Sequence, residues 1–128
     1  MKVLVTGADG LLGSNLVRLL IEKNHQVSVL LHPSSNSTSL DGLNITQFKG
    51  DILKPETLLT PMQECDAVIH AAANTSVWPA RSEMVNKVNI EGTQNMIKSA
   101  LESNIKRFVY IGSGSSVNTP KSEGSKYD

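Results

Sequence analysis

The sequence predicts a doubly wound α/β fold, in which helices cover both faces of a parallel sheet of about five strands. Short apolar runs alternate with longer stretches of helical periodicity along the 128 residues, and this alternation is typical of such a sheet. Three glycines, Gly7, Gly10 and Gly13, follow the first apolar run. They indicate a tight turn from a strand into a helix.

The first half of the chain is predicted to hold three strands, at residues 2–6, 26–31 and 45–49. The second is an almost continuous apolar run, as expected of a strand buried on both faces. Residues 34–42 form a polar loop, which we expect to be mobile and to order when a ligand binds. A helix is predicted at 11–24. Its largely apolar stripe is expected at Leu12, Leu16, Leu19, Leu20 and Lys23.

The second half is predicted to begin with a short helix after Pro55, a residue suited to the first helical position. Strands follow at 67–71 and 107–111, with a long helix at 81–103 between them. Residues 112–128 show no apolar period. The apolar positions of the long helix are Met84, Val88, Ile90, Met96, Ile97, Ala100 and Leu101.

Size and composition predict one soluble domain with its own core. Lys plus Arg and Asp plus Glu number 12 each, so no basic field attracts nucleic acid or an anionic membrane. The single cysteine, Cys65, excludes an internal disulfide and favours the reducing cytoplasm. No apolar segment is long enough for a signal peptide or a membrane span.

The turn at residues 6–13 reads Thr-Gly-Ala-Asp-Gly-Leu-Leu-Gly. Such a turn lets a pyrophosphate approach the backbone, and the helix behind it offers unpaired N–H groups and a positive dipole end. The spacing differs from the usual Gly-x-Gly-x-x-Gly fingerprint. It resembles the Thr-Gly-x-x-Gly-x-x-Gly turn of the extended, epimerase/dehydratase-like short-chain dehydrogenases/reductases, which have a Rossmann-type fold. The residues predicted to bind a dinucleotide here are Gly7, Ala8, Asp9, Gly10, Leu11, Leu12 and Gly13.

Other segments resemble the same family in the same order. Asp51, with Ile52, stands where the family hydrogen-bonds the adenine amino group, although by itself it also fits a turn or cap aspartate. His70 precedes Ala71, Ala72 and Ala73, whose small side chains would leave room for the cofactor. The alternative interpretation is a packed core histidine followed by ordinary alanines.

Asn89 begins the helical run Asn-Ile-Glu-Gly-Thr, which is unusual because Asn, Gly and Thr are modest or poor helix formers. The resemblance implies that Asn89 is buried and that a small residue lies against the neighbouring strands, beside the cofactor. The alternative is a surface asparagine beside a helix-weakening glycine. Ile111, at the end of the last strand, completes the predicted cofactor site.

Ser113 is the best match for the family's Ser or Thr that hydrogen-bonds the substrate oxygen, the alternative being a flexible Ser/Gly connector. The family also needs a Tyr-x-x-x-Lys pair, in which the lysine lowers the pKa of the tyrosine. This sequence contains no such pair, since only Asp128 follows Tyr127. The resemblance therefore leaves open whether the chain is itself an enzyme.

The resemblance also bears on the choice of cofactor. No acid stands at the end of the second strand, where NAD enzymes usually carry one. His32, Ser34 and Ser35 stand there instead and could hold a 2′-phosphate. NADP is therefore favoured over NAD without excluding NAD, and no metal site is expected.

We interpret residues 1–116 as an NAD(P)-binding domain and 117–128 as a tail leading toward a catalytic and substrate region that this sequence lacks. The leading hypothesis is the cofactor-binding part of an oxidoreductase, epimerase or dehydratase acting on a carbonyl or hydroxyl group, inactive alone. A small-molecule substrate, such as a sugar nucleotide or ketone, would bind only with the missing region. The rival hypothesis is a stand-alone, non-catalytic dinucleotide-sensing module. An open sheet edge predicts self-association, possibly as a homodimer.

Overall fold

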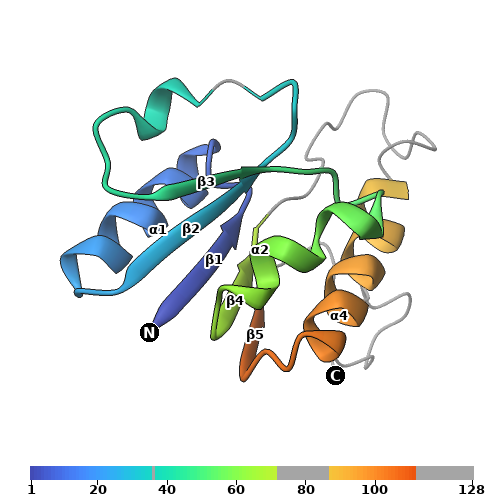
Figure 1. Ribbon diagram of the computed structural model, residues 1–128. Coiled ribbons are helices and arrows are strands. Elements are labelled where there is room, and N and C mark those ends of the chain that lie inside the picture. Colours follow the sequence, from blue (N-terminus) through green and yellow to red (C-terminus); the bar gives the residue numbers. More distant parts are fainter. Residues whose placement is uncertain (36, 72–86, 112–128) are drawn as a thin grey trace, which may run out of the picture.

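The computed structural model describes residues 1–35, 37–71 and 87–111 (Figure 1). They form a five-stranded sheet of order β3-β2-β1-β4-β5, in which every pairing is parallel. This confirms the predicted α/β class, and each predicted strand is found within one residue at either end. The strands are β1 (Lys2–Thr6), β2 (Gln26–Leu31), β3 (Thr46–Lys49), β4 (Ala67–His70) and β5 (Arg107–Tyr110).

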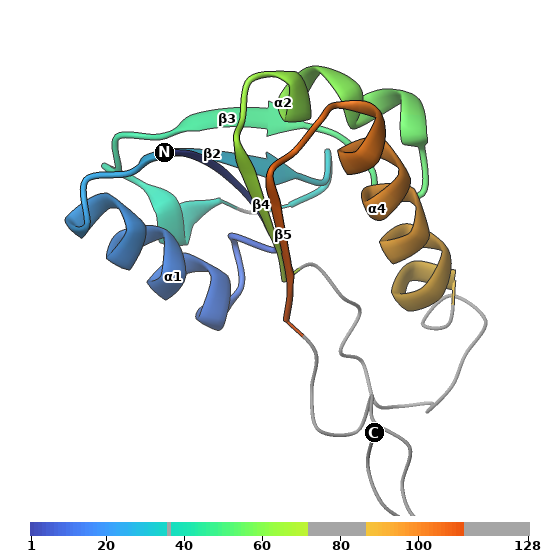
Figure 2. The ribbon, with the colours of Figure 1, turned by 90° about the horizontal axis from the view of Figure 1, so that it is seen from below.

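Helices cover both faces of the sheet. Figure 2 shows α1 (Leu11–Glu22) on one side and α2 (Leu59–Gln63) with α4 (Thr93–Glu102) on the other. Within the described ranges, no helix is long and apolar enough to cross a membrane. The described residues also include shorter helical segments, which are the 3₁₀ turns η1 (Thr38–Leu40) and η2 (Pro55–Thr57) and the π-helical η3 (Lys87–Gly92).

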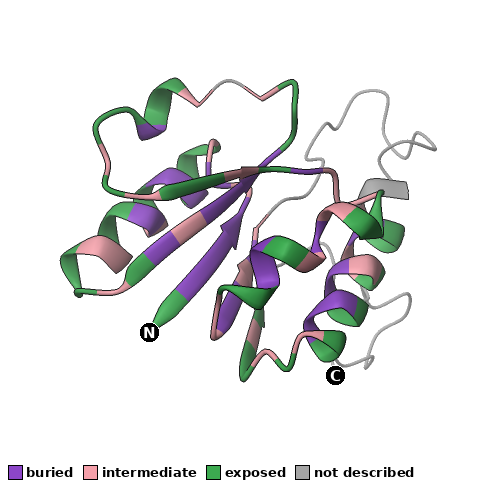
Figure 3. Ribbon diagram, viewed as in Figure 1, coloured by how far each residue is buried: buried purple, intermediate pink, exposed green. Residues whose placement is uncertain are grey.

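Two hydrophobic clusters lie on opposite faces of the sheet, because successive side chains of a strand point to opposite sides. Val3 and Val5 pack with Val17 of α1 on one face, whereas Leu4 packs with Val68 and with Met96 of α4 on the other. In Figure 3 the buried residues of the sheet gather on β1, β2 and β4, whereas β3 and β5 are exposed or intermediate. The carboxyl ends of these strands carry the predicted site.

The buried face of α1 differs from the predicted stripe. Gly13, Ser14 and Val17 face the sheet, while Leu12 and Leu19 are 58% and 49% exposed. Two small residues in successive positions let the helix approach the sheet closely, so the contact face is centred on them rather than on the leucines. The predicted stripe was therefore wrong at Leu12, Leu19 and Lys23, although Leu16 and Leu20 do pack against the core.

The long predicted helix begins, within the described residues, as the π-helical η3 and continues as α4. Met96 and Ala100 are buried, but Ile97 and Leu101 are 44% and 76% exposed. Gly92 is also buried because it lies against Ile52: a Cβ at position 92 would come within 2.5 Å of the Ile52 Cδ1 atom. The helix thus approaches the sheet through its smaller residues.

Both long helices end in the same way, at an asparagine. Asn24 after α1 and Asn104 after α4 have φ angles of 67° and 58°. The N–H of Asn24 donates to Ile21 O at 2.9 Å, and that of His25 donates to Leu20 O at 3.0 Å. These two bonds are the Schellman pattern, in which asparagine tolerates the left-handed conformation better than most side chains do.

Candidate active site

The predicted site residues that the structure describes meet at one edge of the sheet, where the parallel strands end. The glycine turn follows β1, His32 follows β2, Asp51 follows β3, Ala71 follows β4 and Ile111 follows β5. Ligands of open α/β sheets bind beyond the carboxyl ends of the strands, where the strand order reverses. Here β1 lies between β2 and β4, so the reversal occurs at the glycine turn.

Within the turn, the glycines serve different purposes. Gly7 has a φ of 69°, a conformation that favours glycine. A Cβ at Gly13 would lie 2.7 Å from the Gly7 carbonyl carbon and closer still to its oxygen, so packing alone requires glycine there. Gly10 has an ordinary φ of −80°, and a Cβ there would meet only the Gly7 oxygen, at 3.5 Å. The protein itself does not need glycine at position 10.

The start of α1 is suited to an anion. Gly10 caps it without a side-chain hydrogen bond, and its first turn contains no acidic residue. The first N–H groups of a helix lack intrahelical partners and carry the positive end of its dipole. Leu11, beside them, is 84% exposed. A polar backbone edge flanked by an exposed apolar side chain matches a dinucleotide phosphate and its neighbouring apolar surface.

His32 and Asp51 lie together although they follow different strands. The His32 Nε2 and Asp51 Oδ2 atoms are 3.6 Å apart. On the other side of the ring, Nδ1 accepts a hydrogen bond from the Ser34 N–H at 3.1 Å and lies 2.7 Å from Ser34 Oγ. Two of the residues proposed to hold a 2′-phosphate therefore contact one another, and one contacts the residue proposed to bind adenine.

Asp51 is also a turn aspartate. Its Oδ1 accepts the Leu53 N–H at 2.9 Å, and its own N–H donates to Thr57 Oγ1 at 3.0 Å. The structural interpretation of Asp51 is therefore correct, and it coexists with the predicted position at the site. One carboxylate oxygen shapes the chain, while the other faces His32.

His70 is a core histidine, as the alternative interpretation held. Its side chain is 1% exposed, with Nδ1 2.7 Å from Thr6 Oγ1 and Nε2 3.2 Å from Thr93 Oγ1. Thr6 Oγ1 also accepts the Ala71 N–H at 3.1 Å. Burial lowers the pKa of His70 to about 4. This neutral ring joins β1, β4 and α4 directly beneath the site.

The Asn89 segment is anchored to the loop after β3. Asn89 is partly buried and Gly92 buried, and the Asn95 side-chain amide donates to Ile52 O at 2.8 Å. Asn89 and the small residue were predicted to lie inward, whereas Asn95 was not identified and Thr6 and Thr93 were named only within longer motifs. The sequence indicated these three residues only as polar side chains at positions of a helix or strand that face the core.

The polar loop after β2 is attached to the glycine turn. Leu40 is buried in the core, Ser39 Oγ donates to Asp9 O at 3.2 Å, and the Arg18 guanidinium donates to Ser39 O at 2.6 Å. This segment was predicted only as a polar, mobile loop, and neither the burial of Leu40 nor the contact with Arg18 was predicted. The loop thus connects the predicted phosphate site with α1.

Several predicted residues lie outside the described ranges: Ala72, Ala73 and Ser113. In the described part of the chain, no group of three or more His, Cys, Asp or Glu residues gathers where it could hold a metal ion.

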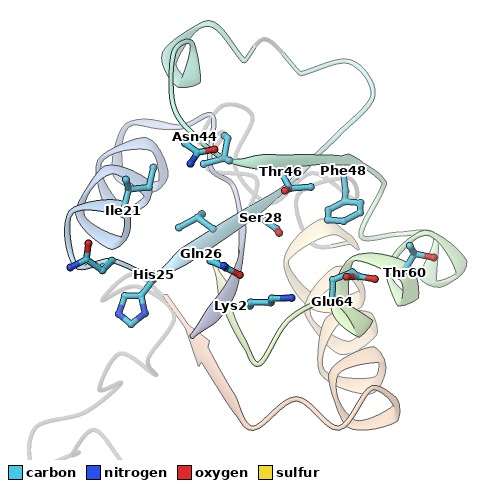
Figure 4. A pocket seen from close by; sticks show the side chains of 13 residues that line it. Lys2, Ile21, His25, Gln26, Ser28, Asn44, Thr46, Phe48, Thr60 and Glu64 are labelled. Carbon is cyan, nitrogen blue, oxygen red and sulfur yellow. The ribbon is translucent and has the colours of Figure 1, made fainter.

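A hollow of about 570 Å³ lies at the opposite, amino-terminal edge of the sheet (Figure 4). Its lining includes Lys2, His25, Phe48 and Glu64 and none of the predicted site residues. The Nδ1 atom of His25 is buried there without a hydrogen-bond partner. The hollow is therefore separate from the predicted dinucleotide site, which lies at the glycine-turn edge of the sheet.

The model of the NAD dependent epimerase/dehydratase family matches residues 3–127. The chain belongs to this family. A putative dihydroflavonol 4-reductase of Synechocystis sp. is 36% identical over 124 residues, which are 97% of this chain and 36% of that protein. A 2-alkyl-3-oxoalkanoate reductase of Stenotrophomonas maltophilia is 35% identical over 90% of this chain and 34% of its own length. This member of the epimerase/dehydratase family thus spans about a third of these curated relatives.

Solved structures agree with this assignment. The crystal structure of gox2253 has a TM-score of 0.85 and 31% identity, covering 97% of this chain and 37% of that one. A UDP-glucose 4-epimerase of Stenotrophomonas maltophila, with bound NAD and formylated UDP-arabinopyranose, has a TM-score of 0.81 and 26% identity over 90% of this chain and 38% of its own. The resemblance to extended short-chain dehydrogenases/reductases and the Rossmann-type fold are therefore confirmed.

Proposed function

We propose that residues 1–116 bind NADP(H) in preference to NAD(H), as the cofactor part of an oxidoreductase, epimerase or dehydratase. The observation that carries the proposal is Gly10, since neither its φ nor its packing requires glycine. Open space above a helix N-terminus is what a pyrophosphate needs in order to approach the backbone. When bound, the nicotinamide would supply hydride transfer to or from a carbonyl or hydroxyl substrate.

Different residues would contact different parts of the cofactor. The turn from Gly7 to Gly13 would take the pyrophosphate, and Asp51 with Ile52 would take the adenine. His32, Ser34 and Ser35 would take the 2′-phosphate, and Asn89, Ile111 and the alanines at 71–73 would line the remaining wall. Ser113 would polarise the substrate oxygen. Because the family's Tyr-x-x-x-Lys pair is absent from this sequence, we expect weak cofactor binding and no turnover from this chain alone.

The test compares two glycine variants by calorimetric titration with NADPH and NADH. Gly10→Ala adds a methyl group that the fold accommodates, so we expect an unchanged melting temperature and at least tenfold weaker binding. Gly13→Ala forces a clash with Gly7, which we expect to cost roughly 1–3 kcal/mol of unfolding free energy. Binding by Gly10→Ala equal to that of the unsubstituted chain would refute the phosphate site.

The rival function, a dinucleotide-sensing module, is favoured by the Ser39 contact between the polar loop and the glycine turn. In that case, cofactor occupancy would alter the loop and a protein contact. Reading the coding sequence beyond the codon for Asp128 separates the two hypotheses. An in-frame Tyr-x-x-x-Lys would support the enzyme, whereas a stop codon would support the sensor.

A further inference from the structure

The His32 ring is held in one tautomer. The Ser34 backbone N–H points at Nδ1 from 3.1 Å. A backbone N–H can only donate, so Nδ1 carries no hydrogen in this arrangement, and the hydrogen of the neutral ring sits on Nε2. Ser34 therefore assigns the tautomer of His32.

The Nε2 side of the ring is also engaged. It faces Asp51 Oδ2 at 3.6 Å, and the Leu53 N–H holds the other oxygen of that carboxylate at 2.9 Å. The His32 side chain is 53% exposed, so a ligand can reach it. A neutral His32 therefore offers a phosphate only its Nε2 hydrogen, because Nδ1 accepts from Ser34, and that hydrogen lies on the side of the ring that faces the Asp51 carboxylate.

The charges around the ring make this arrangement unfavourable for a phosphate. Asp51 is the charged group within ion-pair distance of His32 among the described residues. Lys49 at the end of β3, Asp9 in the glycine turn, and Lys54 and Glu56 shortly after Asp51 are charged side chains on the adjoining elements. Among the described residues, none of these four is recorded in an ion pair with the ring. A phosphate dianion here would meet a neutral imidazole and a carboxylate, and like charges repel.

We propose that NADP(H) binds with uptake of one proton by His32, and that this proton distinguishes NADP(H) from NAD(H). The proton comes from solvent and adds to Nδ1. The Ser34 N–H can then no longer donate to the ring and turns to a phosphate oxygen, while the Nε2 hydrogen stays toward Asp51. The imidazolium lies between two anions that both stabilise it. The inference rests on the proposed cofactor site and adds the way in which it reads the 2′-phosphate.

The experiment is calorimetric titration of the 128-residue chain at about pH 7.5 in two buffers with different ionisation enthalpies. Phosphate monoesters ordinarily titrate near about pH 6. At this pH the 2′-phosphate is therefore mostly deprotonated before binding and contributes little to the uptake. We expect uptake of about half a proton or more per NADPH and none per NADH.

Three variants sharpen the test. His32→Gln should abolish the uptake and most of the preference for NADPH. His32→Arg should abolish the uptake while keeping the preference, because arginine is always charged. His25→Gln, at the opposite edge of the sheet, is the matched control and should behave like the unsubstituted chain.

The outcomes separate the two proposals. If neither cofactor binds, the proposed function fails. If both bind with equal proton uptake, with equal affinity, or with an uptake that survives His32→Gln, the cofactor site stands and this inference is overturned.

Discussion

Acid should destabilise the fold through His70. Its pKa falls from an ordinary 6.5 to about 4 because the buried ring cannot be charged cheaply. Between these two values the unfolded chain binds a proton that the folded chain does not. The contribution of neutral His70 to the unfolding free energy is therefore fully present above about pH 6.5 and is lost progressively as the pH falls toward about 4.

The size of the effect follows from the two pKa values. They differ by about 2.5, and each pH unit corresponds to about 1.4 kcal/mol, so the largest loss of unfolding free energy is roughly 3–4 kcal/mol. Solvent screens this effect little, because His70 is 1% exposed. That is a large part of the roughly 5–15 kcal/mol that holds a typical domain together.

Urea unfolding at half-unit steps from pH 8 to 4.5 measures this slope. The window avoids Asp66, whose pKa is lowered chiefly by the hydrogen bond from the Lys2 N–H and whose contribution is lost only below its ordinary 3.8. His70→Gln cannot titrate and serves as the reference, although it should be less stable at pH 8 through losing ring contacts. A pH slope equally steep in His70→Gln would refute the reasoning.

Two further predictions concern other parts of the fold. Asn24→Ala should lower the unfolding free energy by about 1 kcal/mol, because alanine tolerates a positive φ poorly, whereas Asn24→Gly should not lower it. Urea titration of both variants measures the two values, and equal losses would contradict the proposed role of Asn24 at the helix end. The chain should self-associate at micromolar concentration through the β5 edge, where Val109 and Tyr110 are 48% and 45% exposed. In sedimentation velocity, Val109→Lys should shift the population toward monomer. An unsubstituted chain that stays monomeric would contradict this expectation.

The strands were predictable because a buried parallel strand is an almost continuous apolar run, and the segment from Val27 to Leu31 has this pattern. The glycine turn was predictable because its spacing is local. The partnership of His32 with Asp51 was not, since it depends on the register of β2 against β3. Thr6, His70 and Thr93 likewise come from three elements, and no local pattern reports that their side chains meet.

Side-chain size explains the remaining differences. Helix faces were assigned by hydrophobicity, which selected Leu12 and Leu19, whereas close approach selected Gly13 and Ser14. The same preference put Gly92 rather than Ile90 against the loop after β3. Hydrophobic periodicity identifies apolar positions, but it does not show where a small residue lets a helix approach the sheet closely.

The unequal requirements of Gly10 and Gly13 have an evolutionary consequence. Selection for folding acts on Gly13, whereas selection at Gly10 requires a ligand that passes over it. A descendant of this chain that kept its architecture but abandoned its dinucleotide would be free to replace Gly10 while Gly13 stayed. The state of these two positions in a related gene would therefore indicate whether that lineage still uses the cofactor.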